Sequence, residues 1–128
     1  MRVMVIVKAT EDSEKGVPPT HEAMEAMGKY QEAVAAAGIG QVDGAGLLNS
    51  SQGKRVAFDG ASRTVIDGPF AETRELIAGY SVWEVKDMDE AVAWVKRCPN
   101  PMSGPSEIEI RPLFEWIPAE ESFEEKVL

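Results

Sequence analysis

The first forty residues show an apolar run followed by a helical pattern. Residues 2–8 are almost continuously apolar with charged ends, which is typical of a buried strand. The stretch from Glu11 to Pro19 is polar and rich in Gly and Pro, which predicts a loop. Thr20 is a suitable N-cap after two prolines, and Gly38 is a natural helix stop. The expected helix has an apolar stripe with three- and four-residue spacing: Ala23, Met27, Tyr30, Val34 and Ala37.

The middle of the chain predicts a hairpin set among loops. Residues 39–53 are rich in Gly, Ser and Asn, and only 45–48 are apolar enough to suggest a short strand. Two further short strands are expected at 54–58 and 64–66. They flank Asp59-Gly60, a dipeptide typical of a two-residue hairpin turn.

The last third predicts a strand, a helix and a strand. Residues 72–78 suggest a part-helical connection, and 80–85 combine aromatic and β-branched residues, as strands do. Asp87 with Glu90 three residues later has the spacing of a capping box. Residues 108–111 alternate apolar and charged side chains, which indicates a strand with one wet face. The helix that begins after Asp87 carries its apolar residues on one face: Met88, Ala91, Val92, Val95 and Cys98.

This order of elements favours an α+β domain with ferredoxin-like topology and an inserted β-hairpin. Such a sheet carries helices on one face, so a second copy of the chain is the simplest cover for the other. Trp83 lies on the most apolar strand, where such an interface could form. We expect one domain over residues 1–113, and a tail over 114–128 whose aromatic residues dock on the domain or its partner.

Composition and charge narrow the classes of function. The chain has 128 residues and a net charge of −9, which argues against nucleic-acid binding. No apolar run is long enough to span a bilayer, so no membrane partner is expected. A single cysteine, Cys98, suits the reducing cytoplasm. With His21 as the lone histidine, neither a metal site nor a cofactor is expected.

Several motifs occur in an order that resembles the DGPF branch of the YCII-related family. The resemblance covers roughly residues 1–113. It implies a ferredoxin-like, dimeric α+β barrel, in a family most of whose members have no established activity. The motifs are Asp67-Gly68-Pro69-Phe70-Ala71-Glu72-Thr73-Arg74-Glu75, Gly79-Tyr80, Asp87-Met88-Asp89-Glu90-Ala91, Arg97-Cys98-Pro99 and Glu109-Ile110-Arg111-Pro112-Leu113.

The resemblance also points to His21 as a catalytic residue. In the wider family, a histidine at the start of the first helix pairs with an aspartate near the end of the second. His21 fits the first position, but Cys98 stands where the aspartate is expected. A helix N-terminus disfavours imidazolium, so a neutral His21 there suits a general base. The alternative is an ordinary surface histidine. Cys98 itself is a poor nucleophile near a helix C-terminus, where the dipole raises a thiol pKa.

The Asp-Gly-Pro-Phe segment supplies further candidates. Asp67 is a candidate catalytic carboxylate that orients His21 or a substrate, and a simple turn residue is the alternative. Gly68 is expected to provide an unusual backbone angle. Arg63 and Arg74 are candidates for holding a substrate carboxylate, with solvated ion pairs as the alternative. Phe70 is grouped with these substrate-binding candidates, although packing explains it as well.

Two classes of function follow from these residues. The first is a cofactor-independent enzyme acting on a small polar or carboxylated molecule, with His21 as general base. The second is a non-enzymatic binding or regulatory protein, and the resemblance implies a partner linked to sigma-factor-dependent transcription. Aromatic residues at Tyr80, Trp83 and Trp94 suit a pocket, a core or a dimer interface. The enzyme requires His21 within hydrogen-bond reach of a carboxylate in a concave site, whereas a His21 that faces bulk water argues against it.

Overall fold

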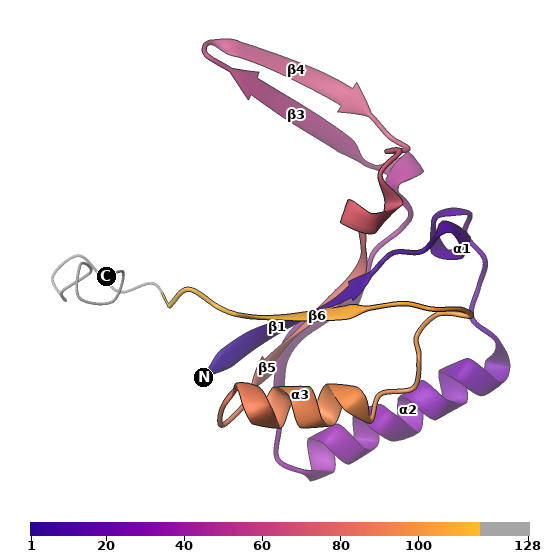
Figure 1. Cartoon of the computed structure of the whole chain (residues 1–128), viewed down its shortest axis with the longest axis vertical. Coiled ribbons are helices and arrows are strands. Elements are labelled where there is room, and N and C mark those ends of the chain that lie inside the picture. Colours follow the sequence, from indigo (N-terminus) through magenta and orange to yellow (C-terminus); the bar gives the residue numbers. More distant parts are fainter. Residues whose placement is uncertain (116–128) are drawn as a thin grey trace, which may run out of the picture.

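A four-stranded antiparallel sheet organises the chain. The computed structural model describes residues 1–115. The strand order is β2-β5-β1-β6, which places β1 and β5 in the centre (Figure 1). The strands are β1 (Arg2–Lys8), β2 (Gly40–Gly46), β5 (Ile77–Glu84) and β6 (Ile108–Pro112).

Two long helices connect these strands. Helix α2 (His21–Ala36) joins β1 to β2, and α3 (Met88–Lys96) joins β5 to β6. The sheet strands and long helices therefore follow the order β-α-β-β-α-β expected from the sequence. The α+β class is confirmed. Within residues 1–115 the sheet is open, with β2 and β6 at its edges, and no closed barrel forms.

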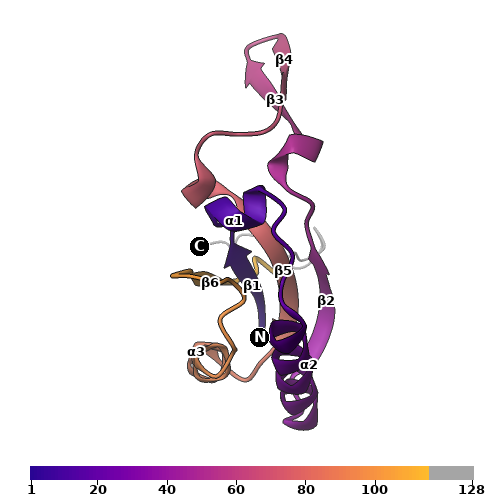
Figure 2. The ribbon, with the colours of Figure 1, turned by 90° about the vertical axis from the view of Figure 1, so that its right-hand side faces the viewer.

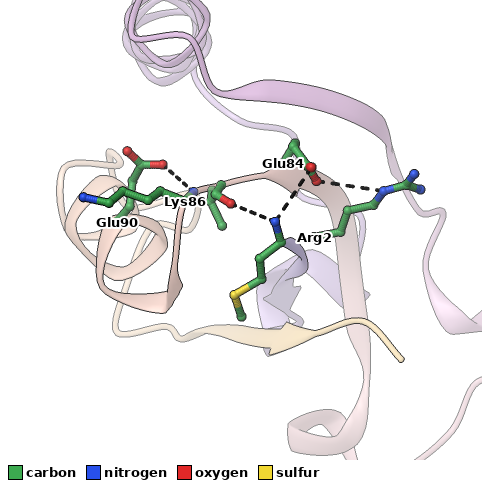
Figure 3. A network of polar contacts seen from close by, with 6 residues as sticks. Arg2, Glu84, Lys86 and Glu90 are labelled. Carbon is green, nitrogen blue, oxygen red and sulfur yellow. Dashed lines mark hydrogen bonds and ion pairs between the residues drawn. The ribbon is translucent and has the colours of Figure 1, made fainter. Parts of the chain in front are cut away.

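Side chains at the first turns fix where both helices begin. The Thr20 hydroxyl accepts a hydrogen bond from the Ala23 N–H at 3.1 Å. The Asp87 carboxylate accepts from the Glu90 N–H at 2.9 Å. The Glu90 carboxylate accepts from the N–H of Lys86, one residue before the cap (Figure 3). Both predicted caps are confirmed.

Polar contacts at the start of β1 tie it to the end of β5. The Met1 amino group donates to the Val85 carbonyl at 3.1 Å and lies 3.7 Å from the Glu84 carboxylate. Arg2 approaches the same carboxylate at 3.9 Å (Figure 3). These groups are partly exposed, so they set the strand register more than they add stability.

The core lies between one face of the sheet and the two long helices. In β1, Val3 and Val5 point toward the helices and are buried, opposite Trp83 and Ser81 of β5. Val34 of α2 and Ala91 of α3 close over them. Partly buried side chains complete the layer: Tyr30, Met88, Trp94, Val95, Ile108 and Ile110. Trp83 is therefore part of the core, which is one of the alternatives that its place in the sequence allowed.

The inserted hairpin stands apart from this sheet. Strands β3 (Lys54–Asp59) and β4 (Ser62–Asp67) pair with each other and contact little else. Figures 1 and 2 show the hairpin at the opposite end of the molecule from α2 and α3. Short 3-10 turns flank it, η1 (Ser50–Gln52) before and η2 (Thr73–Glu75) after.

Three local expectations need correction or lie outside the structure. The strand expected at 45–48 lies earlier in the chain, at Gly40–Gly46 (β2). The backbone of this segment pairs with β5, and this pairing does not depend on its side chains. A short helix, α1 (Glu11–Glu14), interrupts the expected loop, since Thr10 and Ser13 cap it reciprocally. The tail over 116–128 lies outside the described residues. Within residues 1–115 no helix is long and apolar enough to span a membrane.

Replacing Asp87 with Ala should lower the free energy of unfolding by about 1 kcal/mol, because α3 loses its N-cap acceptor. Asp89→Ala removes the same charge from the first turn without removing a cap, so it should cost less. Urea unfolding of both variants measures the difference. Equal losses would show that helix-dipole charge, and not the cap, starts α3.

Candidate functional site

A cavity of about 450 Å³ lies between the sheet and the two long helices. Its floor is the helix-facing side of β1, β2 and β5, and its walls come from α2, the end of α3 and the segment before β6. Its lining residues with polar or sulfur-containing side chains include Tyr30, Gln31, Gln41, Ser81 and Cys98.

The cavity exists because part of its floor has no side chains. Gly44 pairs with Ser81, and Gly46 pairs with Gly79, so these residues share the helix-facing side of β2 and β5. A Cβ on Gly79 would lie 3.1 Å from the Ala45 carbonyl oxygen. A Cβ on Gly46 would meet nothing within 4 Å. The helices therefore rest on the Val3, Val5 and Trp83 end of the sheet and leave a hollow over the glycines.

Tyr30 forms part of the wall and is held as a neutral phenol. Its hydroxyl donates to the Trp94 carbonyl at 2.5 Å, and the two rings lie 6.4 Å apart. Burial, with a smaller contribution from Cys98, raises the pKa of the Tyr30 phenol to about 12. The phenol oxygen keeps lone pairs and can still accept a hydrogen bond from a ligand.

Cys98 lies on the same wall and is also held neutral. Its thiol donates to the Pro99 carbonyl at 3.2 Å and lies 4.0 Å from the Met27 sulfur. Burial raises the pKa of the Cys98 thiol above its usual value. A protonated thiol is a weak nucleophile, so the cysteine in the expected aspartate position contributes packing and polarizable surface.

The cavity has no charged lining residue among those described. Its polar groups are neutral: the side chains of Gln31, Gln41 and Ser81, with the phenol and thiol. Residues 1–115 also hold no group of three His, Cys, Asp or Glu side chains placed to bind a metal ion. The site therefore suits an uncharged molecule held by shape and a few hydrogen bonds.

His21 lies outside this cavity. It is the first residue of α2, and its side chain is exposed. Among residues 1–115 it makes no hydrogen bond or ion pair with another side chain. A second hollow of about 580 Å³ is lined by its neighbours Thr20 and Ala23, but not by His21. The structure thus gives the imidazole neither a carboxylate partner nor a concave site.

Asp67 belongs to the base of the hairpin and does not meet His21. Its carboxylate pairs with the Lys54 ammonium across the strands at 2.5 Å. The Gly68 N–H donates to the Gly53 carbonyl at 3.0 Å, and the Phe70 N–H donates to the Ser50 hydroxyl at 3.0 Å. The segment closes the base of the hairpin on η1.

Position 68 requires glycine because the backbone of Ser50 approaches it closely. A Cβ there would lie 1.7 Å from the Ser50 carbonyl oxygen. Gly68 does not have the positive φ found at Gly16, Gly38 and Gly60, and the unusual backbone angle here is the cis peptide bond between Gly68 and Pro69. The Glu14 carboxylate accepts from both the N–H and the hydroxyl of Ser50, which fixes that oxygen in place.

The three candidate substrate-binding residues are dispersed. Arg63 sits at the hairpin tip, with its guanidinium 4.5 Å from the centre of the Phe58 ring. Arg74 is exposed in η2. Phe70 lies at the hairpin base under the Arg55 guanidinium, 3.9 Å away. None of the three lines the cavity between sheet and helices.

The residues that shape the cavity were missed because they carry no reactive group. Gly44 and Gly46 have the two-residue spacing of one face of a strand, and Gly79 and Ser81 repeat it. Small residues at alternate positions of neighbouring strands were the available signal. This pattern of small residues indicates a cavity only when residues 40–46 are known to form a strand.

Comparison with known proteins identifies the family. The family model of the YCII-related domain matches residues 1–117, so the chain belongs to the YCII-related family. A 56-residue segment is 36% identical to the uncharacterized protein R00369 of Rhizobium meliloti (strain 1021). That match covers 44% of this chain and 45% of the relative, less than half of each. The family resemblance expected from the motifs is confirmed, and it assigns no activity.

The buried phenol predicts a pH effect on stability. Because the folded pKa of Tyr30 is about 12 and the ordinary value is 10.0, the contribution of the neutral phenol is complete below pH 10. It is lost as pH rises toward 12. The stability advantage of wild type over Tyr30→Phe, measured by urea unfolding at pH 9 and pH 11, should therefore shrink at the higher pH. An advantage that is constant or grows would contradict a buried neutral phenol.

Replacing Gly68 with Ala should loosen the hairpin base, at a cost of about 1–3 kcal/mol for the forced displacement. Hydrogen exchange of amides in β3 and β4 should speed up more than exchange in β1. Gly104→Ala is the matched control, because a Cβ there meets nothing within 4 Å. Unchanged hairpin exchange in Gly68→Ala would show that the turn tolerates a side chain.

Proposed function

We propose that this chain is a non-enzymatic small-molecule-binding protein whose ligand is neutral and mostly apolar. The observation that carries this proposal is the cavity of about 450 Å³ between the sheet and helices α2 and α3. Its volume falls in the range of roughly 300–1,000 Å³ that is typical of ligand sites. Its lining is apolar with a few convergent neutral polar groups.

The floor of the cavity supports a binding role. Protein interiors are close-packed, and large voids are rare because they forfeit contacts on every side. Here the hollow lies above Gly44, Gly46 and Gly79, where a single larger residue at Gly46 would fill space without a backbone clash. The glycine part of the floor, which carries no side chains, suits a planar apolar group. The Ser81 hydroxyl and the two glutamine amides at its margin can orient it.

The chemistry of the lining favours binding over turnover. Tyr30 and Cys98 are both held protonated, so neither supplies a base or a thiolate at neutral pH. His21 is exposed and lies outside the cavity. A carboxylated substrate would find no cation there to offset its desolvation. A ligand-sensing role also agrees with the regulatory partner that the family resemblance implies.

Indole should bind this cavity, and indole-3-carboxylate of similar size should not, because burial of its charge is not compensated. The measurement is the shift in unfolding temperature that each probe produces. A ligand that binds the folded state stabilises it by RT ln(1 + [L]/Kd). Equal stabilisation by both probes, or by the carboxylate alone, would overturn the neutral-ligand assignment.

The Gly46→Leu variant tests the location of binding. Its side chain should occupy the hollow and abolish the stabilisation by indole. Gly28→Leu is the matched control, because Gly28 is exposed on α2 and a Cβ there also meets nothing within 4 Å. His21→Ala should bind indole as wild type does. Loss of binding in His21→Ala with retention in Gly46→Leu would move the site to the start of α2.

The thiol of Cys98 gives an independent readout. It is the single cysteine of the chain and lines the cavity. Bound indole should slow its modification by a chromogenic disulfide in wild type and in Gly28→Leu. No protection at saturating indole would show that any thermal effect arises elsewhere.

A further inference from the structure

The apolar stripe of α2 is packed against the core over only part of its length. Ala23, Met27, Tyr30 and Val34 recur along the helix at three- and four-residue spacing. Val34 is the buried member of this stripe. Met27 and Tyr30 line the glycine-floored cavity, whereas Ala23 lines the second hollow, of about 580 Å³. The stripe therefore lies over two hollows in succession.

These two hollows adjoin each other. Ala78, Pro101 and Met102 line both of them. Figure 1 shows α1, the start of α2 and the chain before β6 on the same side of the molecule, and the second hollow is lined by all three. Along α2, the distance from Ala23 to Val34 is about 16 Å at the rise of an α-helix. The two hollows together thus suit a molecule that is longer than a single ring system.

The lining of the second hollow is largely apolar. Three large apolar side chains line it and are exposed, at 53% for Val17, 50% for Leu47 and 81% for Leu48. Pro18 and Pro19 add further apolar surface. Exposed apolar side chains that gather around one hollow are typical of a binding site, because isolated exposed residues of this kind are scattered.

The charge around the second hollow argues against an anionic ligand group. Among the described residues, Asp12 is its one charged lining residue, and the Asp12 carboxylate accepts a hydrogen bond from the Ser103 hydroxyl at 3.0 Å. A ligand carboxylate placed here would meet this negative charge within a chain whose net charge is −9. The part of a ligand that enters the second hollow is therefore uncharged and apolar.

Hydrogen bonds brace the segment that separates the two hollows. The Asn100 side chain donates to the Gly104 carbonyl at 2.8 Å and accepts from the Met102 N–H at 3.0 Å. The Thr10 hydroxyl donates to the Met102 sulfur at 3.5 Å. The backbone of this wall is thus preorganised, which lowers the cost of ordering it around a ligand. The Met102 side chain is unbranched and flexible, so it can turn to let a chain pass.

We propose that the second hollow is a subsite for the apolar tail of the same ligand whose planar head lies on the glycine floor. This inference rests on the proposed function and narrows its ligand class to an uncharged ring that carries an alkyl chain. The chain passes Met102 and lies against Ala23, Leu47 and Leu48. Each methylene that leaves water for this subsite should tighten binding about three- to fourfold.

The test compares indole with 3-hexylindole by calorimetric titration. In wild type, 3-hexylindole should bind at least a hundredfold more tightly than indole. Ala23→Leu fills the second hollow and should reduce this ratio of dissociation constants tenfold or more. Ala35→Leu is the matched control, because Ala35 is exposed on α2 and lines neither hollow. The ratio should stay as in wild type in this control.

A second pair of variants tests the same subsite with a charge. Leu48→Asp places a carboxylate beside the tail and should also reduce the ratio. Phe58→Asp places it at a similarly exposed position on the hairpin, where Phe58 is 71% exposed, and should leave the ratio unchanged. Both positions are exposed, so neither substitution removes a core side chain.

Amide chemical shifts locate the tail directly. The changes that 3-hexylindole produces beyond those of indole should fall on Ala23, Leu47, Leu48 and Met102. Binding of indole that the hexyl chain does not improve, or a gain that Ala23→Leu and Leu48→Asp leave intact, would overturn the tail subsite and leave the proposed function standing. Extra changes confined to the Gln31 and Gln41 end of the cavity would also overturn it. If neither probe binds, the proposed function and the subsite fail together.

Discussion

The structure depends on the burial of Val3 and Val5 in the central strand β1. These side chains lie between β5 and β6 and beneath both long helices, so the core of the domain forms around them. Burying such side chains contributes roughly 1.5–3 kcal/mol each, more than any exposed ion pair in the chain. The capping side chains of Thr20 and Asp87 fix where α2 and α3 begin.

The same arrangement explains where the domain is not filled. The helices are supported at the end of the sheet that carries Trp83, and they span a glycine floor at the other end. A cavity forms in this place because Gly44, Gly46 and Gly79 have no side chains that could fill the space below α2. Its neutral wall follows from burial, which keeps both Tyr30 and Cys98 protonated. Shape and neutrality together make binding the function best supported.

Elements with strong local signals could be predicted from the sequence. Helices α2 and α3 follow from Thr20 and Asp87 as caps and from their apolar stripes, and the hairpin follows from Asp59-Gly60. Strand β2 could not, because its pairing is made by backbone groups of a glycine-rich segment.

The candidate site was harder to predict for a related reason. Reactive residue types drew attention to His21, Asp67 and the arginines, which the fold leaves on separate surfaces. The cavity is made by residues with little or no side chain, and their cooperation depends on strand register. The Asp-Gly-Pro-Phe segment was a sound landmark for the family, and its structural role is to close the hairpin on η1.

The most direct test of this account is an amide chemical-shift titration of the isotope-labelled protein with indole. The account predicts changes that saturate and cluster on Gly44, Gly46, Gly79 and Ser81. The amides of His21 and of the hairpin should stay in place. Changes centred on His21, or none at concentrations that stabilise the protein, would contradict the claim that the glycine-floored cavity is the binding site.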